Sequence, residues 1–128
     1  MTQAEARQIP SSSLAYLGDA AVEILVRRYL VTHPAAGEHP SERSLSFVTA
    51  SAQSAALEVI LPHLTEDEAD VFHRGRNSVH ANVPKSATPS EYRRATGFEC
   101  LFGYLFLTGQ AARADELFRI GYGISDDL

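Results

Sequence analysis

The segment Thr96-Gly97-Phe98-Glu99-Cys100-Leu101-Phe102-Gly103-Tyr104-Leu105-Phe106-Leu107 is the part of the sequence that decides the fold. Its large apolar side chains fall on nearly every side of a helix, which predicts a helix in the middle of a protein. One charged residue, Glu99, lies within this apolar run. An unpaired buried carboxylate is costly, so Glu99 must be paired, protonated or bound to a metal.

The sequence on both sides of this segment also has mostly helical signals. Thr88-Pro89-Ser90-Glu91 is a capping box that begins the core helix, and Thr108-Gly109 ends it. The remaining signals predict helices at about residues 14–32 (capped by Ser12 or Ser13), 40–61 (ended by Pro62), 65–74 (ended by Gly75) and 111–120, with a loop at 77–87. No segment alternates with a period of two, so we expect an all-α, compact helical bundle forming one domain over residues 1–128.

A second carboxylate lies in the apolar helix at 14–32. That helix has little polar surface, so we expect it in the interior, yet Asp19 follows Gly18 near its start. Glu23 and Arg27 follow Asp19 at steps of four, and an i,i+4 ion pair accounts for Glu23. Gly18, like Gly103 in the core helix, removes bulk where the two helices would cross.

Two interpretations of Asp19 and Glu99 remain open from spacing alone. Each carboxylate finds an arginine or a backbone amide, or the two share a divalent cation such as Mg²⁺ with water in its other positions.

Composition excludes several classes of protein. The chain has 128 residues, 45% of them hydrophobic, and a single cysteine, so it is neither a disordered tail nor a disulfide scaffold. It has no signal-peptide pattern and no apolar stretch long enough for a membrane span, so we expect a cytoplasmic protein with no membrane partner.

The net charge of −5 is unevenly distributed. Residues 73–94 hold five basic residues and one acid, which gives this segment +4 and the rest of the chain −9. Two interpretations are open: the segment binds a polyanion, or its arginines pair with the acidic residues 66–70.

These motifs together resemble a known family. Leu14-Ala15-Tyr16-Leu17-Gly18-Asp19-Ala20 resembles the signature helix of ribonuclease III, L-E-F-L-G-D-[AS]. The segment at 96–107 resembles its second catalytic helix, which reads F-E-A-L-I-G-Y-L-Y-L in the Mini-ribonuclease III family. Arg74-Gly75-Arg76-Asn77 and Val83-Pro84-Lys85 also match that family, and the resemblance extends over about residues 12–118.

The resemblance implies an all-helical homodimer with the ribonuclease III endonuclease-domain fold. It implies an endoribonuclease that uses Mg²⁺, with Mn²⁺ as a possible substitute, to cleave double-stranded RNA and mature the ends of the 23S ribosomal RNA precursor. Products would carry a 5′-phosphate and a 3′-hydroxyl. The residues expected to act are Asp19 and Glu99 as catalytic metal ligands, Arg74, Arg76, Asn77, Lys85, Arg93 and Arg94 on RNA, and Tyr16 at the dimer interface.

Two positions depart from the larger ribonuclease III pattern. Ala15 replaces the signature glutamate, and Thr96 stands where the second helix has an aspartate. These departures keep one alternative open, a non-catalytic double-stranded-RNA-binding protein that retains the nuclease fold. A helical protein-interaction module is a further alternative.

Overall fold

The fold consists of helices throughout the part of the chain that the computed structural model describes, residues 1–79 and 87–124. The elements in chain order are α1 (Gln3–Arg7), α2 (Ser11–Thr32), α3 (Pro40–Arg43), α4 (Leu45–Val48), α5 (Ala50–Ile60), the 3₁₀ turn η1 (Leu61–His63), α6 (Glu66–Asn77), α7 (Pro89–Leu107) and α8 (Ala111–Gly121). The prediction of an all-α fold is confirmed.

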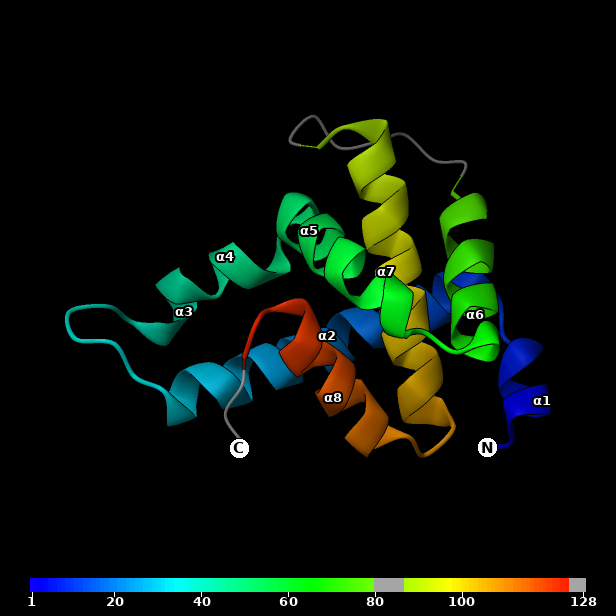
Figure 1. Ribbon diagram of the computed structural model, residues 1–128, viewed down its shortest axis with the longest axis horizontal. Coiled ribbons are helices and arrows are strands. Elements are labelled where there is room, and N and C mark those ends of the chain that lie inside the picture. Colours follow the sequence, from blue (N-terminus) through cyan, green and yellow to red (C-terminus); the bar gives the residue numbers. More distant parts are fainter. Residues whose placement is uncertain (80–86, 125–128) are drawn as a thin grey trace.

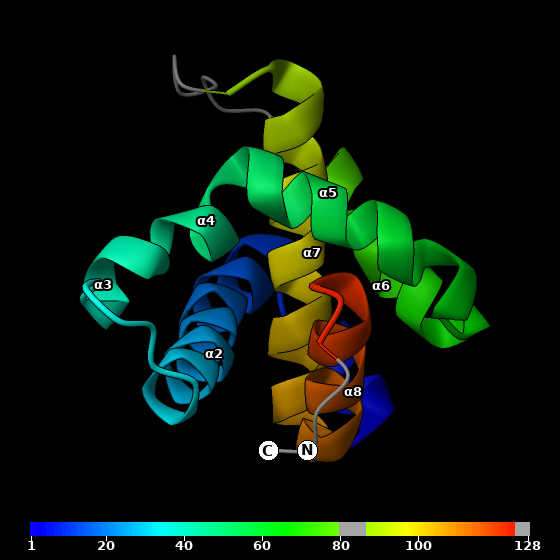
Figure 2. The same ribbon diagram turned by 60° about the vertical axis from the view of Figure 1, so that its left-hand side comes forward.

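Helix α7 is the central helix of this fold (Figure 1), and α2, α5, α6 and α8 pack around it. Figure 2 shows α5 crossing the upper part of α7, with α2 and α6 on either side. All residues of α7 from Cys100 to Leu105 are buried, as is Phe98. The prediction of a core helix is therefore confirmed, and its reason is the one expected: apolar side chains surround the helix axis.

Helix α2 differs from the prediction that it lies wholly inside. One face packs on α7 and buries Leu14, Val22 and Val26, among others. The opposite face leaves Ile24 61% and Val31 69% exposed. The apolar sequence of α2 therefore covers two surfaces, one in the core and one open to solvent.

The single helix predicted at 40–61 is wrong, because the structure divides that segment into α3, α4, α5 and η1. The main break is at Thr49, whose backbone is extended, with φ −68° and ψ 156°. Its hydroxyl accepts a hydrogen bond from the Ala52 amide at 3.2 Å, so Thr49 caps α5 instead of continuing the preceding turn.

Helix α6 also runs further than predicted, to Asn77, because Gly75 lies within it instead of ending it. A Cβ atom at Gly75 would lie 2.6 Å from the Cys100 sulfur, so the glycine allows α6 to approach α7 closely. Most of the loop predicted at 77–87, including Lys85, lies outside the described residues.

The helix caps agree only in part with the caps predicted from the sequence. The capping boxes predicted at Thr65 and Thr88 are confirmed, with both reciprocal hydrogen bonds present in each. The prediction that Ser12 or Ser13 caps α2 is wrong, since the capping position is Pro10. Helix α1 was not predicted, although Thr2 and Glu5 form a third capping box at its start.

A buried ion pair fastens α8 to α6. Glu68 is 4% exposed and accepts hydrogen bonds from Arg113 Nε at 2.8 Å and Arg113 Nη2 at 2.9 Å. Burial alone would raise the pKa of Glu68, but the hydrogen bonds from Arg113 and from Thr65 outweigh it and lower the pKa. Arg113 also pairs with the exposed Glu116.

Glu68→Gln should destabilise the protein at pH 7 by about 2–3 kcal/mol, because glutamine keeps the capping box but leaves Arg113 without its buried carboxylate. Since folding lowers the pKa of Glu68, its contribution is complete above the unfolded-state value near 4.5 and is lost as the pH falls below it. Thermal unfolding from pH 7 to pH 3 should show the two proteins converging in acid. Glu116→Gln is the matched control and should change stability by less than about 1 kcal/mol; a constant Glu68→Gln deficit at every pH would contradict this account.

Across the described residues, no single helix combines the length and apolar character of a membrane span, although the bent pair Pro40–Val48 and Ala50–His63 meets that test jointly.

Candidate active site

The site is built where α2 and α7 cross in direct contact. A Cβ atom added to Gly18 would lie 1.6 Å from the Glu99 carbonyl oxygen, and one added to Gly103 would lie 2.1 Å from the Leu14 carbonyl oxygen. Both glycines are therefore required by the close approach of the two backbones, as the sequence predicted. The crossing brings the residue after Gly18, Asp19, to the side chain of Glu99.

The Asp19 and Glu99 carboxylates lie side by side. Burial, a hydrogen bond to Asp19 and the charge of Asp19 together raise the pKa of Glu99 to about 8. Neither an ion pair nor a hydrogen bond from a backbone amide among the described residues involves either carboxylate, so the interpretation that each finds an arginine or a backbone amide is wrong for residues 1–79 and 87–124. The two groups are short of positive charge, and this is the arrangement that a shared cation relieves.

Gln53 is a member of the site that the sequence did not reveal. It lies on α5, is 3% exposed and lines a cavity together with Glu99, and its side-chain amide opposes the rise in the pKa of Glu99. A glutamine among small residues of a helix carries no sequence signal of this position, because the position depends on how α5 crosses α7.

A surface cavity of about 350 Å³ surrounds the pair. Asp19 and Glu99 line it together with Ala15 and Thr96, the two positions where the larger ribonuclease III pattern has further carboxylates. The departures noted in the sequence are therefore next to the pair in space. Thr96 donates its hydroxyl hydrogen to the Tyr92 carbonyl at 2.9 Å, so its side chain is already engaged.

The donor set fits a divalent cation that keeps much of its water. Mg²⁺ is commonly held in proteins by one or two carboxylates, with water and substrate phosphate filling the other positions. The described residues hold no cluster of three or more His, Cys, Asp and Glu side chains suited to a metal. Asp19, which is exposed, and Glu99, which is partly buried, supply two carboxylates with open space beside them.

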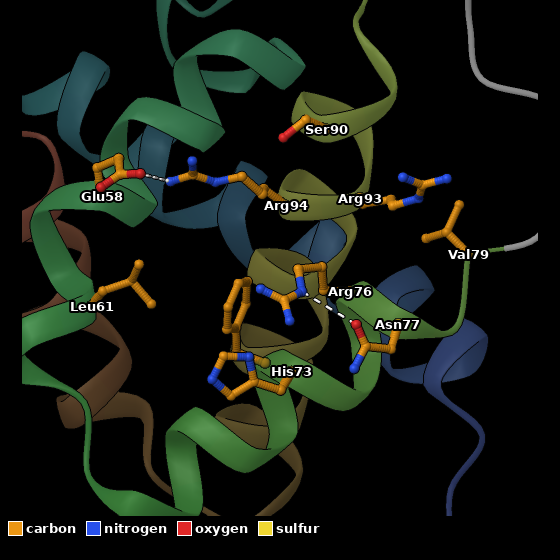
Figure 3. A pocket seen from close by; sticks show the side chains of 10 residues that line it. Glu58, Leu61, His73, Arg76, Asn77, Val79, Ser90, Arg93 and Arg94 are labelled. Atoms are coloured by element: carbon orange, nitrogen blue, oxygen red, sulfur yellow. Dashed lines mark hydrogen bonds and ion pairs between the residues drawn. The ribbon is translucent and has the colours of Figure 1, made fainter.

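The structure separates the residues predicted to bind RNA. Arg76, Asn77, Arg93 and Arg94 line one cavity between α5, α6 and α7 (Figure 3). Arg74 instead donates to the Arg7 carbonyl at 3.1 Å. The alternative that these arginines pair with residues 66–70 is wrong for the described arginines, because Asp67 pairs with Arg7 and Glu68 with Arg113.

Two further predicted residues have clear positions. Tyr16 is 86% exposed on α2, at the edge of the Asp19 cavity. Glu23 accepts a hydrogen bond from Arg27 Nε at 3.0 Å, which confirms the predicted i,i+4 pair.

The fold and this pair of helices match a class of enzymes. Residues 12–110 match the model of the ribonuclease III domain, which spans both α2 and α7. A crystal structure of a protein from Fusobacterium nucleatum superposes with a TM-score of 0.79 at 26% identity, covering 89% of this chain and 92% of that one. The protein is therefore an endoribonuclease with a ribonuclease III domain.

Relatives of higher sequence identity identify the family within this class of enzymes. The chain is 47% identical over 110 residues to the Mini-ribonuclease 3 of Symbiobacterium thermophilum, covering 85% of each chain. It is 36% identical over 121 residues to that of Clostridium tetani, covering 93% of this chain and 80% of the relative. The chain belongs to the Mini-ribonuclease 3 family, as the motifs predicted.

Proposed function

We propose that this endoribonuclease cleaves double-stranded RNA with Mg²⁺ held by Asp19 and Glu99, and that it acts as a cytoplasmic homodimer on the ends of the 23S ribosomal RNA precursor. The whole chain, residues 1–128, forms the single catalytic domain in this proposal. The observation that carries it is the pair of adjacent carboxyl groups, which have no basic partner among the described residues, at the glycine-mediated crossing of α2 and α7.

Each side chain has a defined part in this proposal. Asp19 and Glu99 present carboxylate oxygens to the cation, and the Gln53 amide holds Glu99 in orientation from the buried side. When bound, Mg²⁺ supplies positive charge that stabilises the developing charge on a phosphoryl group and lowers the pKa of bound water. Ala15 and Thr96 add no negative charge beside the carboxylates, which leaves room for a phosphate or water.

Duplex RNA offers its shape, its phosphates and its 2′-hydroxyls, because its deep major groove hides the base edges. The basic residues of the segment 73–94 suit such a partner. We therefore assign RNA contacts to Arg74, Arg76, Asn77, Arg93 and Arg94, and to Lys85 outside the described residues.

The exposed apolar face of α2 supports dimerisation. Tyr16, Ile24 and Val31 lie within one face of the helix by their spacing, and each is more than half exposed. A run of large exposed apolar side chains on one helix face is typical of a surface that another chain covers. We therefore place Tyr16 at the interface between two copies of this chain.

Ile24→Glu should convert the dimer to a monomer, raising its dissociation constant about 100-fold or more because an unpaired charge would be buried. Sedimentation velocity over a range of protein concentrations measures this. The control is Val59→Glu, which places the same charge at an apolar position of α5 that is 49% exposed. A wild-type protein that sediments as a monomer at every concentration would rule out the dimer.

The proposed function is tested by incubating the pure protein with duplex RNA, with single-stranded RNA of the same sequence, and with a 23S precursor, in Mg²⁺ or in EDTA. We expect cleavage of the duplex only, in Mg²⁺ only, with 5′-phosphate and 3′-hydroxyl ends, and cuts in the precursor that end-mapping places at its mature termini. Duplex binding without cleavage at any Mg²⁺ concentration would reject the proposal.

A further inference from the structure

A larger cavity lies on another side of α7 from the carboxylate pair. Its volume is about 710 Å³, within the range of small-molecule sites. Figure 3 shows side chains entering it from three elements: Arg76 and His73 from α6, Ser90, Arg93 and Arg94 from α7, and Glu58 from α5. It shares no lining residue with the cavity around Asp19 and Glu99.

The arginines of this cavity carry uncompensated charge. Among the described residues, Arg74, Arg76 and Arg93 lack a carboxylate partner, whereas every other arginine pairs with an Asp or a Glu. Two of these three, Arg76 and Arg93, line the cavity. The third cavity arginine, Arg94, pairs with Glu58 and donates to the Ser54 carbonyl. The described lining therefore has a net charge of +2 with histidine neutral.

Arg76 is held in place instead of extending freely into solvent. Its Nε donates to the Asn77 side-chain oxygen at 3.3 Å, and its guanidinium carbon lies 5.7 Å from the centre of the Phe72 ring. These contacts engage Nε and one face of the guanidinium. No hydrogen bond among residues 1–79 and 87–124 uses its two terminal nitrogens, which form the edge that an arginine presents to a phosphate.

The first turn of helix α7 adds hydrogen-bond donors to the cavity. Ser90 lines the cavity from this turn and supplies a hydroxyl group. Pro89 has no backbone N–H, and the Glu91 amide donates to Thr88 Oγ1 at 3.1 Å, so the Ser90 amide is the one amide of the first three helical residues that no hydrogen bond among the described residues uses. The Glu91 carboxylate in the same turn offsets part of the helix dipole. The affinity of the cavity for phosphate therefore rests mainly on the guanidinium groups of Arg76 and Arg93.

We propose that this cavity is a second, non-catalytic site that binds a phosphate group, with Arg76 and Arg93 as its principal ligands. Its volume accommodates a nucleotide, either free or as part of an RNA strand. The RNA source rests on the proposed nuclease function, whereas phosphate binding itself does not. Because Arg93 and Glu99 are on different faces of α7, the bound phosphate is not the one being cleaved.

The test uses pyrophosphate as the probe, in EDTA and without RNA, with binding followed by NMR of the arginine side chains and by calorimetry. We expect saturable shifts of the Arg76 and Arg93 signals. The double variant Arg76→Gln/Arg93→Gln should bind at least about 10-fold more weakly, because both charge-assisted contacts are lost. Arg27→Gln is the control: it removes an exposed arginine charge on α2, outside the cavity, and it should bind within about twofold of wild type. The proposal is overturned if Arg76 and Arg93 do not respond, or if Arg27→Gln weakens binding as much as the double variant.

Two further arms identify the source of the phosphate. For an RNA strand, the double variant lowers the slope of log affinity for duplex RNA against log salt by about 2, roughly one for each lost phosphate contact. For a free nucleotide, that slope is unchanged, and binding of a nucleoside monophosphate falls in parallel with pyrophosphate. A protein that binds pyrophosphate at Arg76 and Arg93 but cleaves no RNA would refute the proposed function and leave this site intact.

Discussion

Asp19→Asn and Glu99→Gln should each reduce duplex RNA cleavage in Mg²⁺ by about 1000-fold or more, because the charge stabilisation that a bound cation supplies is worth several kcal/mol. Each substitution keeps the shape of the side chain and replaces one carboxylate oxygen by an amide nitrogen, which does not bind Mg²⁺. The two residues act on one cation, so the double variant should lose little more than either single variant. Single-turnover cleavage with excess protein measures the chemical step without product release.

The matched control for these variants is Glu23→Gln. Glu23 lies one turn after Asp19 on α2, and its carboxylate is engaged by Arg27. The cleavage rate of Glu23→Gln should stay within about threefold of the wild-type rate, since an exposed ion pair contributes little. Thermal unfolding shows whether the variants remain folded. Glu99→Gln is expected to be about as stable as wild type at pH 7, because the pKa of Glu99 is raised to about 8 and the neutral glutamine replaces a carboxyl group that is already mostly protonated. Wild-type rates in Asp19→Asn and Glu99→Gln would reject the site.

Gly18→Ala should destabilise the protein by more than about 3 kcal/mol and lower Tm by about 10 °C or more, because overpacking against backbone atoms cannot be relieved by a side-chain rotation. The new Cβ atom would lie 1.6 Å from the Glu99 carbonyl oxygen, so α2 and α7 would have to move apart. The same displacement would separate Asp19 from Glu99, and cleavage should fall even at temperatures where the variant remains folded. Thermal denaturation and single-turnover cleavage at low temperature measure the two effects.

Gly121→Ala is the matched control for the crossing. Gly121 is also helical, but a Cβ atom there would meet nothing closer than the Ile60 Cγ2 atom at 3.1 Å, which belongs to a side chain that can shift, and the Ala56 Cβ and carbonyl oxygen at 3.3 Å. Its cost should be below about 1 kcal/mol. Equal stability of Gly18→Ala and wild type would contradict the close crossing of α2 and α7.

The sequence predicted the core of this fold because several independent signals coincide in α7. A capping box, a first-turn proline, a continuous apolar run and a terminal Thr-Gly fix its bounds. The carboxylate pair was predictable for a related reason. Asp19 and Glu99 are each a charged residue within an apolar part of a helix, and each has a glycine nearby. Residue chemistry and the resemblance to the Mini-ribonuclease III family led to the same two positions.

Other features depend on tertiary contacts that leave no local signal. Thr49 breaks a predicted helix because its hydroxyl caps α5, and nothing in its neighbours distinguishes it from an ordinary helical threonine. A glycine often ends a helix, but Gly75 lies within α6 and allows this helix to pack closely against Cys100. Gln53 reaches Glu99 only because α5 crosses α7, and Arg74 and Arg76 face different partners because two residues span about 200° of a helix.

The central claim is that Asp19 and Glu99 hold the catalytic cation. The most direct test replaces one of these two ligands by a residue that prefers a different metal ion. A thiolate favours soft cations over Mg²⁺, so in Asp19→Cys the ratio of cleavage rates in Cd²⁺ and Mg²⁺ should rise at least about tenfold over wild type. Glu23→Cys, one turn along α2, should leave that ratio unchanged. The same ratio in Asp19→Cys as in wild type would contradict the claim.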